Sequence, residues 1–184
     1  NSLANAKNLV IDTTAPTIVE VISSAADGAY GVGVTIDIIV TADELVTVTG
    51  TPQITLETGG IDQTVNYSGA VATPLTLLTF QYTVAAGDIS ADLDYVGTTS
   101  LVLNGGTILD AGSNAMTLTL AAPGAANSIG DNQAIVLDTV DPTVSGVTAS
   151  VIDGNYGAGS VIDIEVTMDE LVTVTGTPTI TLET

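Results

Sequence analysis

The sequence predicts an all-β protein, an antiparallel sandwich of short strands that is repeated along the chain. Three observations carry this prediction. Apolar residues alternate with threonine and other polar residues over many short segments, which is the period of a half-buried strand. Clusters of glycine, asparagine, aspartate and proline separate these segments. Residues 1–58 align with residues 127–184 without a gap, and about 34 of the 58 pairs are identical.

The clearest strand signal lies at residues 34–41, where every even position is apolar. The second copy keeps its even positions 162, 164 and 166 apolar, whereas Glu165 replaces Ile39, as an outward-facing position permits. Other expected strands are 18–24, 45–49, 53–57, 64–67, 77–84, 101–103, 107–109, 116–120 and 134–137. We expect the core to include Val34, Ile36, Ile38, Phe80, Tyr82 and Val136.

Between the strands lie turn sequences, and no segment shows a helical period with capping residues. The turns are expected at 27–28, 59–60, 105–106 and 110–114. Many short strands at this spacing favour an immunoglobulin-like sandwich, with a jelly roll as the lesser alternative. The segment Asp92-Leu93-Asp94-Tyr95 is either a tyrosine corner or a short turn of helix.

Composition excludes several classes of function. The chain has 184 residues and a formal charge of -20, yet 45% of its residues are hydrophobic, so a disordered polyanion is excluded. It contains no histidine, cysteine or tryptophan, and Lys7 is its only basic residue. Thiol chemistry, imidazole bases, Cys/His zinc sites and a basic nucleic-acid surface are therefore excluded. No apolar run is long enough to span a bilayer, so we expect no membrane insertion.

The repeat sets the expected domain organisation. Residues 1–12 should be the last strand of a preceding repeat, 13–138 a complete repeat, and 139–184 the first strands of the next. The linker occurs twice, at 11–18 and 137–144, each time with a proline that suits the start of a strand. No signal peptide or anchor is visible, so we expect an internal part of a longer protein. Both ragged ends should be completed by more chain or by neighbouring molecules, because incomplete sheets leave apolar faces uncovered.

Acidic residues recur in the linkers and turns, where they are candidate ligands for calcium. Calcium takes six to eight oxygens from carboxylates and carbonyls on loops, and almost no acid here can pair with a basic residue. The alternative is an ordinary set of solvated polar turns. One expected site joins two repeats and uses Asp27, Asp110, Asp138, Asp141, Asp169 and Glu170. A weaker site upstream uses Asp12, Asp43 and Glu44, because Ala15 stands where the second linker has Asp141.

One further acidic grouping and the low aromatic content do not indicate an enzyme. Asp92 and Asp94, with Asp88 nearby, form either another metal site or a solvated rim. A glycosidase would need two carboxyls across a cleft lined by aromatic residues, but only 3% of the residues are aromatic and the tyrosines are scattered. We therefore expect Tyr67 and Tyr82 in the core and no catalytic residues.

A series of short motifs follows one another along the chain. In order they are Asp27-Gly28 with Tyr30, Ile36-Asp37-Ile38, Asp43-Glu44, the segment 46–52, Asp92-Leu93-Asp94-Tyr95, 105–108 and 110–114. The order resembles that in tandem immunoglobulin-like repeats of giant bacterial surface and secreted adhesins, including biofilm-associated and RTX-type adhesins. Two departures are the turn at 110–114, where glycine does not directly precede asparagine, and Ala15 in the first linker.

The resemblance implies a calcium-dependent spacer at the bacterial cell surface, outside the cell. Its partners would be neighbouring repeats or copies, and other domains of such a protein would contact surface glycans. An alternative from another class is a segment of an extracellular filament or surface layer assembled by strand exchange. A lesser alternative is a carbohydrate-binding module.

Overall fold

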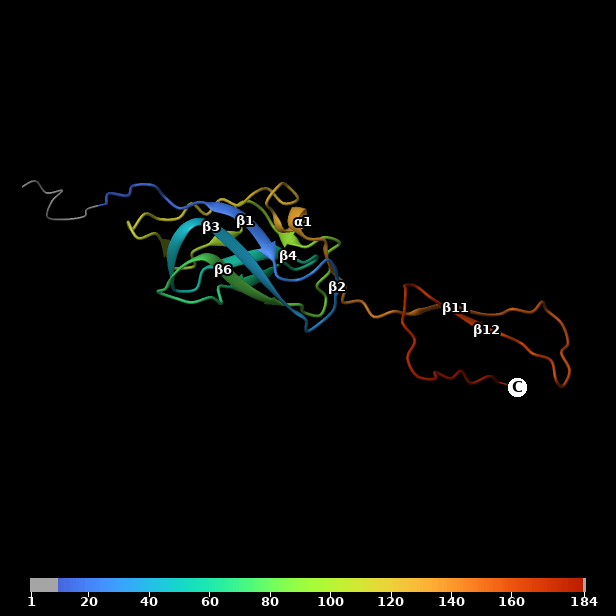
Figure 1. Ribbon diagram of the computed structural model, residues 1–184. Helices are drawn as coiled ribbons and strands as arrows, with labels where there is room; N and C mark the ends of the chain where they lie inside the picture. The colour runs from blue at the N-terminus through green and yellow to red at the C-terminus, as the bar shows by residue number, and fades with distance from the viewer. Residues whose placement is uncertain (1–9, 184) are drawn as a thin grey trace, which may run out of the picture. The chain divides into compact units, whose positions relative to one another are not determined.

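The computed structural model describes residues 10–183 and divides the chain into two compact units, the first ending at Thr139 and the second starting at Val140 (Figure 1). The first unit is a sandwich of two antiparallel sheets with a small third sheet, and residues 140–183 of the second unit contain two paired strands. The predicted all-β sandwich is confirmed. The expected strand in residues 1–12 lies mostly outside the described residues, and residues 10–17 form no strand.

The first sheet is built around β3 (Thr35–Thr49), which pairs with β1 (Ile18–Ser23) on one side and β6 (Pro74–Thr83) on the other. Strand β9 (Thr107–Leu109) pairs with the C-terminal end of β3. Even-numbered residues of β3 face inward as predicted, and Ile36 and Ile38 are buried. The prediction for Val34 is wrong: it precedes β3 and is 38% exposed, because the sandwich does not extend over that turn.

The second sheet is built around β4 (Gln53–Glu57), whose predicted bounds are confirmed. It pairs with β5 (Gln63–Asn66), and along its other edge with two short strands, β7 (Asp94–Tyr95) and β8 (Leu101–Val102). A bridge between Tyr67 and Phe80 joins this sheet to β6 of the first sheet. The two sheets therefore meet along one side of the sandwich.

A third, two-stranded sheet is parallel. Strand β10 (Ile135–Leu137) pairs with β2 (Gly28–Tyr30), which was not predicted as a strand and begins at the second residue of the predicted turn 27–28. This parallel pairing places β10, the last strand of the first unit, beside β2, the second strand in sequence order. Within β10 the prediction for Val136 is wrong: Ile135 and Leu137 are buried and Val136 is only half-buried, because the alternation is shifted by one residue.

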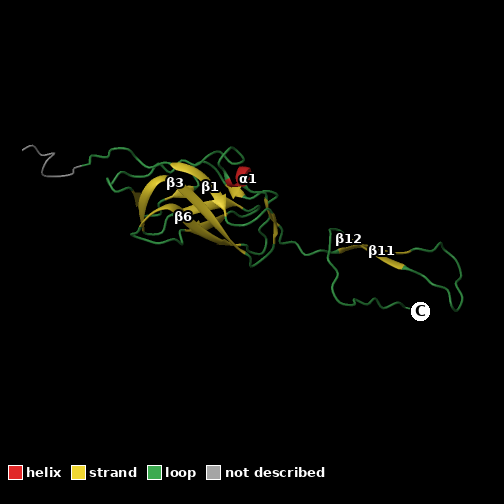
Figure 2. Cartoon of the chain, viewed as in Figure 1, coloured by secondary structure: helices red, strands yellow, loops and turns green. Residues whose placement is uncertain are grey.

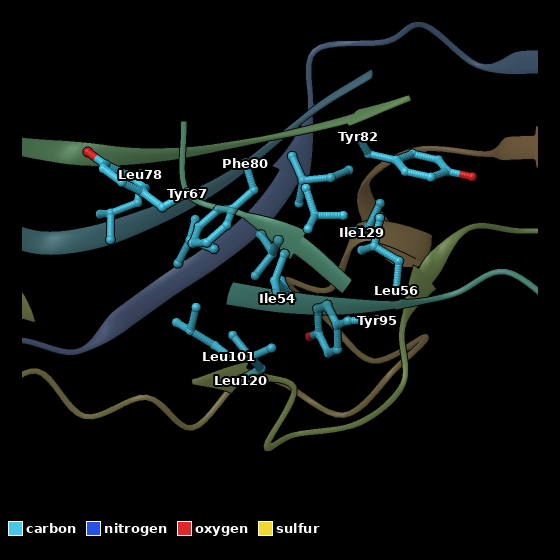
Figure 3. Packing of buried hydrophobic residues seen from close by; sticks show 14 of the residues in the cluster. Ile54, Leu56, Tyr67, Leu78, Phe80, Tyr82, Tyr95, Leu101, Leu120 and Ile129 are labelled. Atoms are coloured by element: carbon cyan, nitrogen blue, oxygen red, sulfur yellow. The ribbon is translucent and has the colours of Figure 1, made fainter. Parts of the chain in front are cut away.

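The core lies between the two main sheets (Figure 3). Phe80 and Tyr82 on β6 are buried as predicted, and Tyr67 is also buried. The rings of Tyr67 and Phe80 pack edge to face with centroids 5.7 Å apart. Figure 3 shows Phe80, Tyr82 and Tyr95 in one cluster with aliphatic side chains such as those of Ile54 and Leu56.

Three sequence-based expectations about local structure are wrong. Residues 35–49 form one strand with a bulge where two strands, 34–41 and 45–49, were predicted. Five steps along β3 from Thr41 to Val46 match two steps along β6. Residues 116–120 form no strand, although Met116 and Leu120 are buried. A four-residue helix, α1 (Ile129–Asn132), is too short to show a helical period, although Ser128 caps it by accepting a hydrogen bond from the Asp131 amide.

The second unit repeats the first strand pair of the first unit. Strands β11 (Val144–Ala149) and β12 (Ile164–Met168) pair in the register of β1 and β3, displaced by 126 residues, and include the same bulge. The described remainder of this unit is loop (Figure 2). The two units therefore share the same local pairing although most residues of β1 and β11 differ, and although no second sheet is present among residues 140–183.

Candidate metal centre

Three carboxylates gather at the end of the first unit where the linker arrives. Asp12, Glu44 and Asp110 each place one oxygen within 4.8 Å of the others. Asp12 is exposed, Glu44 is half-buried and Asp110 is buried. Together they offer up to six oxygen atoms, which is the donor chemistry that calcium prefers. We call these three residues the acidic triad.

Each member of the triad comes from a different segment of the chain. Asp12 lies in the linker before β1, Glu44 lies in the bulge of β3, and Asp110 begins the turn after β9. Glu44 occupies an even position of β3, between the buried residues Ala42 and Val46, so it is directed toward the inner side of the strand. The bulge thus places a carboxylate at the rim of the core, where an ordinary strand would place an apolar residue.

Hydrogen bonds hold the linker and the Asp110 turn together. The Asp110 carboxylate accepts from the Asn114 amide at 2.7 Å and from Asn114 Nδ2 at 2.8 Å. The same Asn114 side chain donates to the backbone carbonyl of Asp12 at 3.2 Å. A few residues later, the Thr117 amide donates to the carbonyl of Pro16 at 2.8 Å. The 110–117 segment therefore fixes the path of the linker over the unit.

The charges of the triad repel one another. Partial burial raises the pKa of Glu44, and the negative charges of Asp12, Asp110 and Asp43 raise it further. The hydrogen bonds from Asn114 lower the pKa of Asp110, so this group stays ionised beside Glu44. Residues 10–183 contain no lysine, arginine or histidine that could neutralise this cluster. A bound cation would relieve the repulsion directly.

Asp43 and Asp169, two of the predicted ligands, each accept hydrogen bonds from a threonine of the linker. Asp43 accepts two hydrogen bonds from Thr17, from the amide at 2.8 Å and from the hydroxyl at 2.6 Å. In the second unit, Asp169 accepts the same two bonds from Thr143 at the same distances. These bonds lower the pKa of both carboxyls. Each aspartate therefore acts as a clamp that fixes the threonine after the linker proline. In the first unit, the neighbouring residue Glu44 belongs to the acidic triad.

The prediction that Asp110 lies beside Asp138 is wrong. It assumed that the last strands form a hairpin-linked meander, but β9 pairs with the C-terminal end of β3 and so brings Asp110 to Asp12 and Glu44. Asp27 lies at the start of β2 and accepts a hydrogen bond from the Ala134 amide at 2.9 Å.

Of the three remaining predicted ligands, one belongs to the first unit and two to the second. Asp138 is exposed at the end of the first unit, and its amide donates to the Tyr30 carbonyl. Asp141 and Glu170 are exposed residues of the second unit. Asp110 belongs to the acidic triad, and the rest of the expected set of six carboxylates stays a prediction.

Two aspartates that the sequence suggested as a rim or a metal site are buried acceptors instead. Asp88 accepts from the Tyr82 hydroxyl, the Ala85 amide and the Gln63 side chain. Asp94 accepts from the amides of Gly124 and Gly130 and so holds the loop before α1. Asp92 alone is exposed, as a rim residue would be. Both buried groups come from segments whose sequence carries no burial signal, since an aspartate in a turn is usually solvated.

Tyr95 settles the role of its segment. Its hydroxyl donates to the carbonyl of Ala121 at 2.8 Å, 26 residues downstream, and it lies in strand β7. The segment is therefore neither a helical turn nor a tyrosine corner, whose hydroxyl bonds a few residues upstream. Burial and the nearby charge of Asp94 raise the pKa of Tyr95 to about 12, so the hydroxyl keeps its proton and remains a donor.

Comparison with protein-family models, with curated proteins and with solved structures finds no match to this chain. The resemblance to bacterial adhesin repeats therefore stays a prediction. Within residues 10–183, no helix has both the length and the apolar character needed to cross a membrane.

Proposed function

We propose that this chain is a structural spacer of a long bacterial surface or secreted adhesin, in which calcium fixes the linker between successive sandwich repeats. The observation that carries the proposal is the acidic triad, which combines a linker carboxylate with two from the body of the first unit. A cation there would tie the linker to the sandwich. The repeated strand pair and the duplicated Thr–Asp clamp support a tandem arrangement of like units.

The proposed mechanism is electrostatic. Without a cation, ionised Asp12 and Glu44 repel each other and favour release of the linker from the unit. With calcium bound, the linker would be held in the one conformation in which it contacts Asn114 and the Thr17–Asp43 clamp. The remaining negative charge, part of a formal charge of -20, keeps neighbouring chains apart.

Calcium titration of the chain and of a Glu44→Gln variant tests this proposal. The wild-type chain should bind calcium with a dissociation constant on the order of 10⁻⁴–10⁻³ M, the range of extracellular modules, and bind magnesium more weakly. Glu44→Gln keeps the shape of the side chain but removes one charge, so affinity should fall at least tenfold. Glu20→Gln on β1 removes the same charge away from the triad and is the control. Equal calcium affinity in all three chains would exclude the triad as the site.

A second candidate is a segment of an extracellular filament assembled by strand exchange. The observation that favours it is the second unit, whose apolar side chains are exposed beside an incomplete sheet. Sedimentation of the purified chain over a range of concentrations separates the two candidates. A spacer stays at the mass of one chain, whereas a strand-exchange subunit grows into polymers.

A further inference from the structure

The turn between β8 and β9 carries the one Asn–Gly pair of the chain, Asn104-Gly105. Both residues are exposed, and both have positive φ, 46° at Asn104 and 77° at Gly105. The amide of Gly106 donates to the carbonyl of Leu103 at 2.8 Å and closes the turn, which is therefore type I′. Asparagine and glycine suit such a turn because they tolerate the left-handed conformation best.

An asparagine and the glycine after it can also react with each other. The side-chain carbonyl carbon of asparagine is an electrophile, and the backbone nitrogen of the next residue can attack it and close a succinimide ring. The bond from this carbon to the side-chain nitrogen breaks, and that nitrogen takes up the proton of the backbone amide and leaves as ammonia. Water then opens the ring at either of its two carbonyl carbons, which yields aspartate or isoaspartate. Glycine favours ring closure because it has no Cβ to obstruct it.

We propose that Asn104 is a site of spontaneous deamidation, and that the closed turn slows the reaction. In the closed turn, Asn104 Nδ2 donates to the carbonyl of Thr51 at 3.2 Å. A side chain held in this way cannot rotate onto the nitrogen of Gly105, so this hydrogen bond has to break before the ring can form. Opening of the turn therefore controls the rate of modification. The inference depends neither on calcium nor on the proposed function.

The isoaspartate product does not fit the closed turn. In isoaspartate the main chain runs through the side chain and is longer by a methylene group. The chain just beyond the turn has no room to shift, because a Cβ built on Gly106 would overlap the backbone oxygen of Thr49. The Thr107 hydroxyl also lies 2.7 Å from the Thr49 hydroxyl, where β9 begins to pair with β3. Conversion at residue 104 should therefore loosen the pairing of β9 with β3.

Ageing of the full chain at mildly alkaline pH, followed by peptide mapping with mass spectrometry, tests the proposal. The peptide that contains Asn104 should convert first, and its products should include both aspartate and isoaspartate. Conversion should be about tenfold faster or more when the chain is unfolded in urea, because the turn is then open. Asn66 is the control within the same chain, since it is also exposed but is followed by Tyr67, whose side chain obstructs the ring. Asn104→Gln should abolish conversion at this position.

Conversion at Asn66 before Asn104, aspartate without isoaspartate, or equal rates in the folded and unfolded chains would overturn the proposal. Urea midpoints test its consequence for the fold. Ion exchange separates the converted chains by their additional negative charge, and these should unfold at a lower urea concentration than the Asn104→Asp variant, which carries that charge without the longer main chain. Equal midpoints would overturn the inference that the product loosens β9.

Discussion

Replacing Tyr82 by phenylalanine should destabilise the first unit and weaken its hold on the outgoing chain. The Tyr82 hydroxyl donates to Asp88 Oδ2 at 2.6 Å, and Asp88 is only 3% exposed. The Asp88 turn in turn binds Thr139, the last residue of the unit, whose hydroxyl donates to the Asp88 carbonyl at 2.9 Å. The substitution removes one donor from a buried carboxylate and leaves that oxygen with the Ala85 amide alone.

The expected loss is about 1.5–3 kcal/mol, the usual contribution of a hydrogen bond to a charged group. For a unit of this size it corresponds to a fall in melting temperature of roughly 6–12 °C. Urea unfolding followed by tyrosine fluorescence measures it, since four of the five tyrosines lie in the first unit. Tyr30→Phe is the control, because its hydroxyl donates to a neutral carbonyl at the surface, and it should change stability by about 0.5 kcal/mol or less.

The effect should depend on pH with a definite sign. Burial alone would raise the pKa of Asp88, but the hydrogen bonds from Tyr82, Ala85 and Gln63 outweigh it and hold the pKa below its ordinary value of 3.8. The stability that this carboxylate contributes is therefore present above that value and is lost as pH falls through the folded-state pKa. The difference between wild type and Tyr82→Phe should shrink in acid. Equal urea midpoints at neutral pH, or a difference that does not change with pH, would refute this reasoning.

Three further outcomes are expected. Gly106→Ala should lower the free energy of unfolding by about 1–3 kcal/mol, because a Cβ there would overlap a backbone oxygen of β3. Gly60→Ala is the control in the same urea assay and should be neutral, because a Cβ at Gly60 meets nothing within 4 Å. Phe80→Ala should lower the free energy of unfolding by about 3–5 kcal/mol, because Phe80 is fully buried, whereas Val34→Ala should lower it by less than about 1 kcal/mol. A loss of about 2 kcal/mol or more for Val34→Ala in the urea assay would mean that Val34 belongs to the core. Calcium affinity measured by calorimetry should fall as pH is lowered through the raised pKa of Glu44, because the protonated carboxyl no longer binds the cation; a flat profile would exclude Glu44 as a ligand.

Alternation predicted the sheets well where one face of a strand is buried along its whole length. Ile36, Ile38, Phe80 and Tyr82 were placed correctly because each lies in a long strand between the two layers. Prediction was poorer where the chain changes direction. Val136 was assigned to the wrong face because β10 has only three residues, too few to establish a period.

The sequence predicted the kind of ligand atoms at the candidate site, but not the full set of residues that form it. Composition alone indicated that the acidic residues lack basic partners, and Asp12 and Glu44 were grouped correctly from the linker repeat. Asp110 was placed at the wrong end because its position depends on which strand β9 joins, and that pairing is a long-range choice without a local signature. The hydrogen bonds between Asp43 and Thr17 could not be predicted either, because they join residues 26 positions apart.

The parallel pair of β10 and β2 decides how the first unit would respond to tension. Figure 1 shows the linker reaching this unit at one end and the chain leaving at the other, beside β2. A pull on Asp138 along β10 would act on the C-terminal end of that strand. The backbone bonds on either side of β10, to β2 and to Ser90 and Leu93, lie across that direction. These hydrogen bonds would be loaded in shear and would have to break at the same time. Under such a load, β10 should resist extension more than a strand whose hydrogen bonds break one after another.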